Sequence, residues 1–205
     1  MYCYVFGALE IESFDYKIND TDLVIAADNG IKNTNKFNIK PHFVIGDFDS
    51  LGFVPEGNNI IVHPVEKDDT DTMLAVKKGF EKGYNNFKIF GCIGGRLDHT
   101  IANIQTASYI AQNGGTCTFV GDKECFTVIK NSSISFNESH KGDISVFALE
   151  NSTGVNIKGL HYEIENGQLT PDFPLGASNK FTNNPSEITV KSGTLLIIWQ
   201  KQNLI

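Results

Sequence analysis

The sequence lacks the features of a membrane-bound or secreted protein. No apolar run approaches the ~20 residues that a membrane-spanning helix needs. No basic stretch opens the chain, and Glu10 and Glu12 come too early for a signal peptide. The 4 cysteines include no Cys-x-x-Cys pair, so we expect reduced, buried thiols rather than disulfides or a zinc site. We therefore predict a cytoplasmic protein with no membrane partner.

A basic surface is also missing. The 17 Lys and Arg residues are outnumbered by 24 Asp and Glu residues, which gives a formal net charge of −7. Sequence-independent binding of DNA or RNA depends on positive charge facing the phosphates, so we expect no nucleic-acid partner. The P-loop motif, the G-x-G-x-x-G dinucleotide motif and the nucleophile elbow are absent as well. These absences disfavour P-loop enzymes, dinucleotide-binding domains and Ser-His-Asp hydrolases.

Short apolar runs alternate with helical patterns in the first half of the chain. Runs of about five residues bounded by Gly, Pro and Asp are typical of buried strands. The expected strands cover residues 23–27, 42–46, 59–63, 87–91 and 116–120. Amphipathic patterns predict helices over 72–82 and 97–113, each followed by a glycine of the kind that ends helices. This alternation predicts an α/β domain with a largely parallel sheet.

The second half has no helical pattern. The expected strands cover residues 133–136, 143–149, 154–157, 187–191 and 194–199. Lys191, Ser192 and Gly193 separate the last two of them and predict a hairpin loop. We therefore predict two domains: an α/β domain over residues 1–127, and an all-β sandwich or barrel domain over residues 132–205.

The acidic residues are concentrated in one stretch. Between Asp47 and Asp71 the chain has 7 carboxylates and a single basic residue, Lys67. Two carboxylates ~4 Å apart repel by about 4 kcal/mol at an effective dielectric constant of 20. If several of them meet, a cation must neutralise them or some must be protonated. Hard divalent cations such as Mg²⁺ prefer these oxygen ligands and keep positions open for phosphate oxygens.

Each acidic motif also has a purely structural interpretation. Asp47 and Asp49 follow a strand and would point to the same side, but Asp and Ser residues also favour ordinary turns. Asp68, Thr70 and Asp71 open the expected helix at 72–82, where such residues commonly cap the free N–H groups. Three acids in four positions exceed what capping needs, so we favour a functional role for this segment.

A glycine-rich turn joins the strand at 87–91 to the helix at 97–113. Gly94 and Gly95 would let a phosphate approach the backbone, and the helix N-terminus would offer it N–H groups. Arg96 can add a bidentate phosphate contact. The alternatives are a tight turn with a solvated arginine, and a surface position for His99. Because Asp28, Asp47, the acids at 68–71 and this turn all follow expected strands, they would lie along one edge of a parallel sheet, where ligands bind. Together they predict a metal–nucleotide site.

Taken together, four motifs resemble those of the thiamine pyrophosphokinase family in order and spacing. They are Asp28-Asn29-Gly30, Gly46-Asp47-Phe48-Asp49-Ser50, Asp68-Asp69-Thr70-Asp71 and Gly94-Gly95-Arg96-Leu97-Asp98-His99. Ser178 and Asn179 in the all-β half also match, and the resemblance covers nearly the whole chain. It implies an enzyme that transfers the pyrophosphoryl group of ATP to the hydroxyl of thiamine, giving thiamine diphosphate and AMP.

The resemblance also implies residue roles. Asp47, Asp49 and Asp71 would hold Mg²⁺ and the phosphates, with Arg96 and Asp98 at the triphosphate as further catalytic residues. The ATP-binding residues would be Asp28, Gly30, Asp68, Thr70, Thr72, Gly94, Gly95, Arg96 and His99. Ser178 and Asn179 would bind thiamine. Independently of the resemblance, Trp199 is the only tryptophan, and it either covers the ring of thiamine or is a core residue. The family is homodimeric, with each active site combining the α/β domain of one subunit with the β domain of the other.

Two other functions stay open. A pyrophosphokinase for another hydroxymethyl compound, such as a pterin, would need the same acidic residues. A module that binds nucleotide or thiamine diphosphate without turnover would not need them. The acids concentrated at strand ends therefore favour an enzyme.

Overall fold

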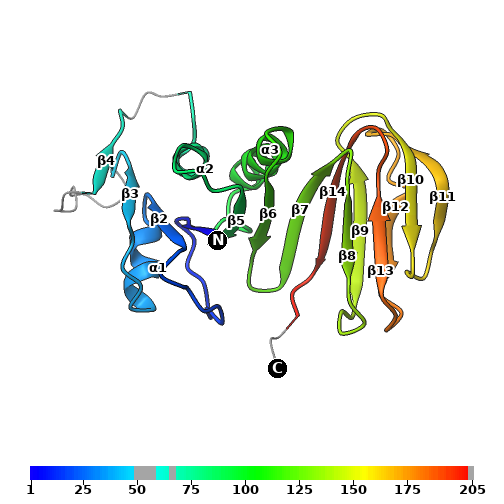
Figure 1. Cartoon of the computed structure of the whole chain (residues 1–205), viewed down its shortest axis with the longest axis horizontal. Helices are drawn as coiled ribbons and strands as arrows, with labels where there is room; N and C mark the ends of the chain where they lie inside the picture. Colours follow the sequence, from blue (N-terminus) through cyan, green and yellow to red (C-terminus); the bar gives the residue numbers. More distant parts are fainter. Residues whose placement is uncertain (49–58, 65–67, 203–205) are drawn as a thin grey trace. The chain divides into compact units, whose positions relative to one another are not determined.

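The computed structural model describes residues 1–48, 59–64 and 68–202 (Figure 1). The predicted metal ligand Asp49 lies outside these residues. The chain divides into two compact units, Met1–Asp122 and Lys123–Ile205, which we call unit 1 and unit 2. None of the helices in the described part of the chain has both the length and the apolar character that crossing a bilayer demands.

Unit 1 is an α/β unit whose described strands all pair parallel to one another. Its strands run in the order β6-β5-β1-β2-β3-β4. They are β1 (Cys3–Phe6), β2 (Leu23–Ala27), β3 (Phe43–Gly46), β4 (Ile60–Val62), β5 (Asn86–Phe90) and β6 (Thr116–Val120). The parallel sheet predicted from the alternating pattern is therefore present, and the carboxyl ends of its strands share one edge.

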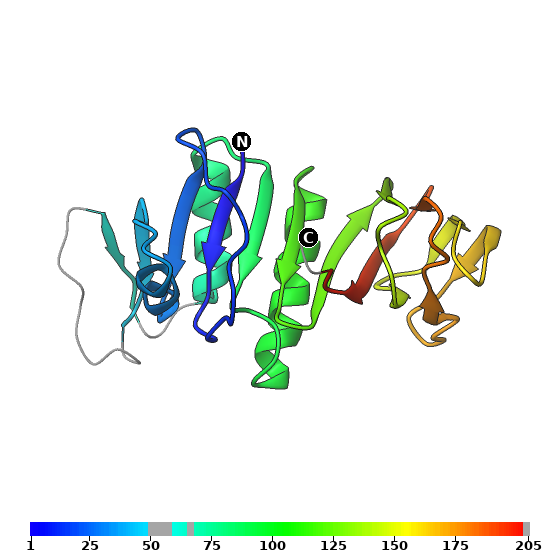
Figure 2. The same ribbon diagram turned by 90° about the horizontal axis from the view of Figure 1, so that it is seen from below.

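Three helices in the described part of unit 1 cover its sheet. They are α1 (Gly30–Lys36), α2 (Asp71–Glu81) and α3 (Leu97–Gln112). Helices α2 and α3 contact each other on one face, whereas α1 lies on the opposite face (Figures 1 and 2). The strands β1 and β2 are buried along their whole length, as expected for central strands with helices on both faces.

Unit 2 contains β-strands and, among the residues described, no helix. Its strands are β7 (Glu124–Lys130), β8 (Ser133–Phe136), β9 (Asp143–Ala148), β10 (Ser152–Lys158), β11 (Ile164–Leu169), β12 (Gly176–Lys180), β13 (Ser186–Thr189) and β14 (Thr194–Gln200). They pair antiparallel in the orders β12-β9-β14-β7 and β11-β10-β13-β8. Phe136 on β8 and Trp199 on β14 join the two groups of strands through a ring contact with centroids 5.3 Å apart.

The predicted hairpin at Lys191, Ser192 and Gly193 is wrong. Strand β13 pairs with β10 and β8, whereas β14 pairs with β7 and β9 in the other group of strands. Both edges of β14 are already occupied, so β13 has no free edge to pair with. Gly193, with φ of 128°, lies in the connection between the two groups, where a Cβ atom would be 2.2 Å from the Ser152 hydroxyl oxygen.

Candidate active site

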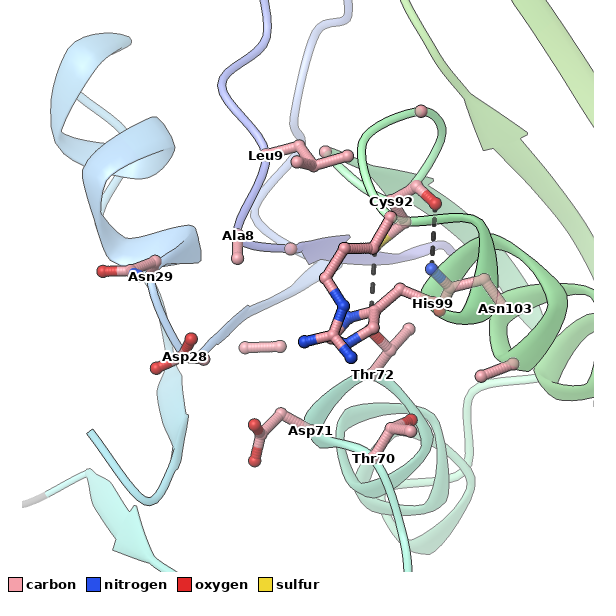
Figure 3. A pocket seen from close by; sticks show the side chains of 16 residues that line it. Ala8, Leu9, Asp28, Asn29, Thr70, Asp71, Thr72, Cys92, His99 and Asn103 are labelled. Atoms are coloured by element: carbon pink, nitrogen blue, oxygen red, sulfur yellow. Dashed lines mark hydrogen bonds between the residues drawn. The ribbon is translucent and has the colours of Figure 1, made fainter. Parts of the chain in front are cut away.

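A cavity of about 380 Å³ opens at the carboxyl-end edge of the unit 1 sheet (Figure 3). Its walls come from segments far apart in the sequence: residues 7–9 after β1, 27–29 at the end of β2, 70–72 at the start of α2, and the turn between β5 and α3. These are the positions where parallel α/β sheets bind ligands. The sequence-based prediction placed its acids and its glycine turn at this edge.

Two residues at the end of β2, Asp28 and Asn29, form part of the cavity wall. Asp28 has a left-handed backbone conformation with φ of 48°, and its N–H donates to the Ile45 carbonyl at 2.7 Å. Gly46 passes so close that a Cβ atom there would lie 3.1 Å from the Asp28 Cα. Among the described residues, the Oδ1 atoms of Asp28 and Asn29 are buried and have no hydrogen-bond partner. Buried polar atoms normally have partners, so these oxygens are candidates to bind a ligand.

The start of α2 combines capping with exposure to the cavity. The Thr70 hydroxyl accepts a hydrogen bond from the Met73 N–H at 3.2 Å, so the capping interpretation is right for this residue. Asp71 follows in the first turn, and Thr70, Asp71 and Thr72 all line the cavity. Asp69, by contrast, is held by Lys77 through contacts of 2.7 and 2.8 Å to its two oxygens. Within this segment, Asp71 lines the cavity and Asp69 is held by Lys77.

The turn between β5 and α3 supplies a glycine-rich backbone and a positive charge. Gly91, Gly94 and Gly95 have φ values of 66°, 93° and 68°, a region that favours glycine. Arg96 lies at the N-cap of α3 and makes a bidentate contact with Asp98, at 3.1 and 2.5 Å. The Arg96 guanidinium lowers the pKa of the Asp98 carboxyl, and Asp98 raises the pKa of Arg96. Both side chains are largely exposed, so a phosphate could displace Asp98 at little cost.

Cys92 of this turn and two residues of α3, His99 and Asn103, also lie at the cavity. The Asn103 side chain donates to the Cys92 carbonyl at 2.8 Å and thereby fixes the turn to α3. Burial raises the pKa of the Cys92 thiol to about 11, so this thiol is neutral near pH 7. His99 also lines the cavity.

The structure brings many, but not all, of the predicted unit 1 residues together. Those that line the cavity are Asp28, Thr70, Asp71, Thr72, Gly94, Arg96 and His99. Those described but outside its lining are Gly30, Asp47, Asp68, Gly95 and Asp98. In the described part of the chain, no group of three His, Cys, Asp or Glu side chains is placed to share a metal ion. With Asp49 outside that part, the three-aspartate metal site stays a prediction.

The predicted thiamine-binding residues lie in unit 2. Asn179 is 3% exposed, and its amide bridges the Tyr162 N–H and carbonyl at 2.9 and 2.6 Å. Ser178 has φ of 57° and lies where the β12–β9 register shifts. Trp199 is 8% exposed and contacts Phe136, as the core alternative for this residue requires. Asn179 thus has a structural task, whatever its part in ligand binding.

Sequence reasoning missed the loop that follows β1. Gly7, Ala8 and Leu9 line the cavity, yet they form no recognisable motif. A usable signal was the glycine directly after the buried run at residues 3–6, which has the same form as the other strand ends.

Comparisons with known proteins cover most of the chain. Residues 14–119 match the thiamin pyrophosphokinase catalytic domain, and residues 131–195 match the thiamin pyrophosphokinase vitamin B1 binding domain. The thiamine pyrophosphokinase of Bacillus subtilis (strain 168) is 25% identical over 184 residues, 86% of either chain. Thiamin pyrophosphokinase 1 of Caenorhabditis elegans is 25% identical over 180 residues, 82% of this chain and 73% of the relative.

Solved structures show the same fold. The crystal structure of thiamine pyrophosphokinase from Bacillus subtilis superposes with a TM-score of 0.86 at 21% identity, covering 99% of this chain and 100% of the other. That of thiamin pyrophosphokinase from Geobacillus thermodenitrificans gives a TM-score of 0.82 at 19% identity, covering 99% of each chain. Because the two matched domains together span well over half of its residues, the chain belongs to the thiamin pyrophosphokinase family, a family of enzymes.

Proposed function

We propose that the cavity of unit 1 binds ATP and that the chain transfers the pyrophosphoryl group of ATP to the hydroxyl of thiamine. In this reaction the hydroxyl oxygen bonds to the β-phosphorus, and AMP leaves with the oxygen that bridged the α- and β-phosphorus atoms. The observation that carries the proposal is the meeting of Asp28, Asp71 and Arg96 around one cavity at the edge of a parallel sheet. Their chemistry suits a nucleotide whose phosphates are partly neutralised by a cation.

Backbone N–H groups and one arginine would bind the phosphates. The turn with Gly94 and Gly95 exposes backbone at the start of α3, and the N-terminus of a 16-residue helix favours negative charge. Arg96 would exchange its exposed contact with Asp98 for a bidentate contact with a phosphate. Thr72 and His99 line the same cavity and would contact the remainder of the nucleotide.

The oxygen atoms at the cavity fit a magnesium ion. The buried, unpaired Oδ1 atoms of Asp28 and Asn29 and the carboxylate of Asp71 are hard oxygen donors of the kind Mg²⁺ prefers. We propose that Asp71 holds the ion together with Asp47 and Asp49, the residues that the family resemblance implies. When bound, Mg²⁺ would neutralise phosphate charge and stabilise the leaving AMP.

The protein's own part in the transfer is positioning. Phosphoryl-type transfer needs aligned reactants and charge stabilisation more than covalent chemistry by side chains. Asp71 or Asp98 would orient the thiamine hydroxyl, and Arg96 would stabilise charge on the transferred group. Thiamine would contact Ser178 and Asn179 in unit 2, whereas Trp199 belongs to the core of that unit. The match of residues 131–195 to a vitamin B1 binding domain supports this assignment.

The proposed dimer rests on the family resemblance, and the proposed location rests on the sequence. We propose a cytoplasmic homodimer whose subunits share each active site, with ATP bound by the α/β domain and thiamine by the β domain. The two antiparallel groups of strands in unit 2 would form a sandwich, as the contact between Phe136 and Trp199 suggests. Light scattering of the purified protein would test the dimer, because a monomer at micromolar concentration contradicts it.

The experiment that tests the activity is direct. The purified chain is incubated with ATP, Mg²⁺ and thiamine, and the products are separated by chromatography. AMP and thiamine diphosphate should form in equal amounts and only when thiamine is present. Release of AMP with a hydroxymethylpterin but not with thiamine would move the assignment to another pyrophosphokinase. Binding of ATP or thiamine diphosphate without any turnover would reduce the chain to a binding module.

A further inference from the structure

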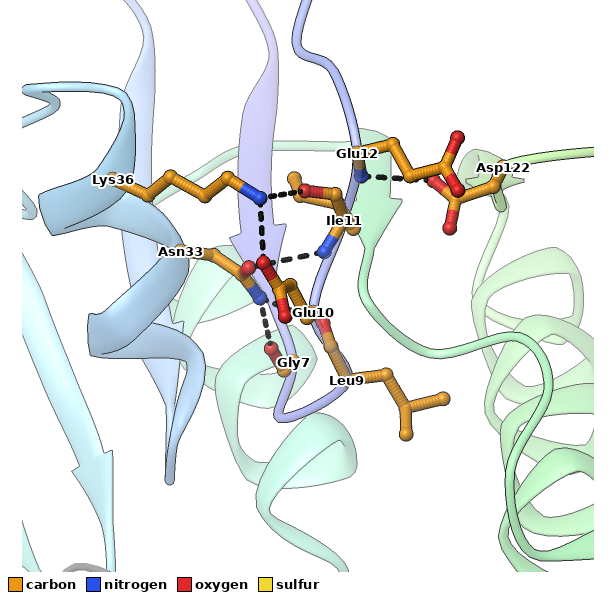
Figure 4. Close-up of polar contacts among 8 residues, drawn as sticks. All are labelled: Gly7, Leu9, Glu10, Ile11, Glu12, Asn33, Lys36 and Asp122. Carbon is orange, nitrogen blue, oxygen red and sulfur yellow. Dashed lines mark hydrogen bonds and ion pairs between the residues drawn. The ribbon is translucent and has the colours of Figure 1, made fainter.

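The loop after β1 forms part of the cavity wall without any secondary structure of its own. We call residues 7–12 the β1 loop; its first three residues line the cavity. An irregular loop that must present a fixed surface needs anchors elsewhere in the fold. Figure 4 shows these anchors, which come from α1 and from the end of β6.

The central anchor is Asn33 of α1, which is 2% exposed. Its Nδ2 atom donates to the carbonyls of Gly7 and Leu9 at 2.9 and 2.8 Å, and its Oδ1 accepts from the Ile11 N–H at 3.2 Å. Both amide hydrogens are therefore used, and the reversed amide orientation would lose all three bonds. One buried side chain thus fixes the backbone of the β1 loop at three points.

The other anchors are weaker. Lys36, one helical turn after Asn33, contacts the Glu10 carboxylate at 2.7 Å and the Ile11 carbonyl at 3.0 Å. Glu10 is 80% exposed, so this ion pair contributes little. The Glu12 N–H donates to the Asp122 carboxylate at 3.1 Å, also at the surface. Of these three side-chain anchors, Asn33 is the one that water does not reach.

The β1 loop in turn contacts the glycine turn of the phosphate site. The N–H groups of Gly7 and Leu9 donate to the carbonyls of Phe90 and Gly91 at 2.7 and 3.0 Å. A Cβ atom at Gly91 would lie 2.5 Å from the Leu9 carbonyl oxygen and 3.1 Å from Asn33 Nδ2. The Leu9 side chain reaches Gly95, where a Cβ atom would be 3.0 Å away. A displaced β1 loop would therefore disturb the turn as well.

We propose that Asn33 is a positioning residue for ATP binding: it preorganises the β1 loop and, through that loop, the glycine turn that faces the phosphates. Asn33 acts without touching the ligand, since it is not part of the cavity lining. The inference rests on the proposed function only in naming ATP as the occupant. An unanchored loop would be competent for a fraction of the time, and the apparent Kd would rise by the inverse of that fraction.

A matched pair of variants separates positioning from stability. Asn33→Leu removes the three loop contacts at nearly constant side-chain size. Asp22→Leu is the control: Asp22 is 3% exposed and accepts three hydrogen bonds, from Tyr2 N–H at 2.8 Å and from the Asn19 N–H and Nδ2 at 2.9 and 3.2 Å. These contacts lie at the opposite end of β1 from the cavity. Both variants lose a buried polar cluster, but only Asn33→Leu releases the β1 loop.

The measurements are the Kd for ATP with Mg²⁺, the KM and kcat of the reaction, and amide hydrogen exchange of peptides covering residues 7–12. For Asn33→Leu we expect at least about a tenfold rise in the Kd and KM for ATP, equivalent to about 1.4 kcal/mol, with kcat within about threefold and faster exchange in the loop. For Asp22→Leu we expect a lower melting temperature with the Kd for ATP within about twofold. Lys36→Met changes an exposed anchor and should leave folding intact. It should raise the Kd for ATP by about two- to threefold.

Two results would overturn the inference. One is a loosened loop in Asn33→Leu or Lys36→Met with ATP affinity unchanged. The other is an equal loss of ATP affinity in Asp22→Leu. The wild type tests the proposed function separately. If it binds ATP but forms no thiamine diphosphate, the proposed function is refuted, and the Kd values of the variants for ATP still decide the role of Asn33. A wild type that binds no ATP refutes both.

Discussion

Replacing Gly30 by alanine tests whether this predicted ATP-binding residue acts through packing. Gly30 begins α1, and a Cβ atom there would lie 1.8 Å from the Phe6 carbonyl oxygen and 2.6 Å from the Phe6 carbonyl carbon. Both atoms belong to the backbone of the central strand β1, so no rotamer change can relieve the contact. The Gly30→Ala variant must therefore push α1 away from the sheet.

The expected cost follows from this geometry. Overpacking a tightly packed site costs about 1–3 kcal/mol, and alanine in a helix returns at most about 1 kcal/mol relative to glycine. Because backbone atoms make the clash, we expect a net loss of about 2 kcal/mol in the free energy of unfolding. For a chain of this size that lowers the melting temperature by about 4–8 °C.

The assay is thermal unfolding followed by circular dichroism, with and without ATP and Mg²⁺. Lys32→Ala, at an exposed position of the same helix, is the control and should shift the melting temperature by less than about 2 °C. Suppose that Gly30→Ala loses ATP affinity but melts within about 1 °C of the wild type, a shift too small for a loss of about 2 kcal/mol. The packing argument is then wrong. Gly30 would then be a ligand contact instead.

Three further outcomes test the site and unit 2. Asp71→Asn should abolish most turnover with little change in the melting temperature, because Asp71 lines the cavity. Asp69→Asn, in the same segment but paired with Lys77, should keep turnover. Equal activities for the two variants would contradict the assignment. In an NMR titration the pKa of Asp98 should lie below its ordinary range in the wild type and should rise in Arg96→Gln. Because the folded-state pKa is lowered, the stability that the ion pair adds is present at neutral pH and is lost as the pH falls through that pKa. The same Asp98 pKa in both proteins would refute the ion pair. Phe136→Ala should destabilise unit 2 by about 3–5 kcal/mol in chemical unfolding, because Phe136 is 5% exposed and its ring contacts Trp199. Phe173→Ala, at a residue that is 64% exposed, should change the free energy of unfolding by less than about 0.5 kcal/mol. Comparable losses in the two variants would rule out a core role for Phe136.

Much of the α/β half could be predicted because its buried strands are short apolar runs that end in Gly, Asp or Pro. Strands β2, β3, β5 and β6 and helices α2 and α3 were found in this way, within one or two residues. Strand β1 was missed although it is an apolar run followed by a glycine, which is the same form as the strands that were found. Helix α1 has the sequence GIKNTNK, and its buried positions include the polar residues Asn33 and Thr34, so it has no apolar stripe.

The second half was less predictable because tertiary contacts replace local signals there. Strands β11 and β12 contain the residues Asn166 and Ser178 at positive φ, and they lie at the edges of their groups, where polar residues are tolerated. The mistaken hairpin before β14 arose from the same limit. A turn-like sequence says that the chain changes direction, but not which strand it will pair with next.

The site was predictable in its acids and its glycine turn, which lie in recognisable motifs at strand ends. Asn33 was not, because its importance depends on three backbone groups 22 to 26 residues away in the sequence. The two unpaired oxygens at Asp28 and Asn29 likewise become visible only once burial is known.

The place of β1 in the sheet has a consequence for how the chain folds. Cys3 pairs with Leu23 on one side and with Phe87 on the other, so the second edge of β1 has no partner until β5 has been synthesised. Contacts between such distant residues slow folding, because a long intervening segment must be closed before they form. During translation the second edge of this apolar strand would stay unpaired while nearly half of the chain emerges from the ribosome. Chaperone binding to nascent chains should be strongest in that interval.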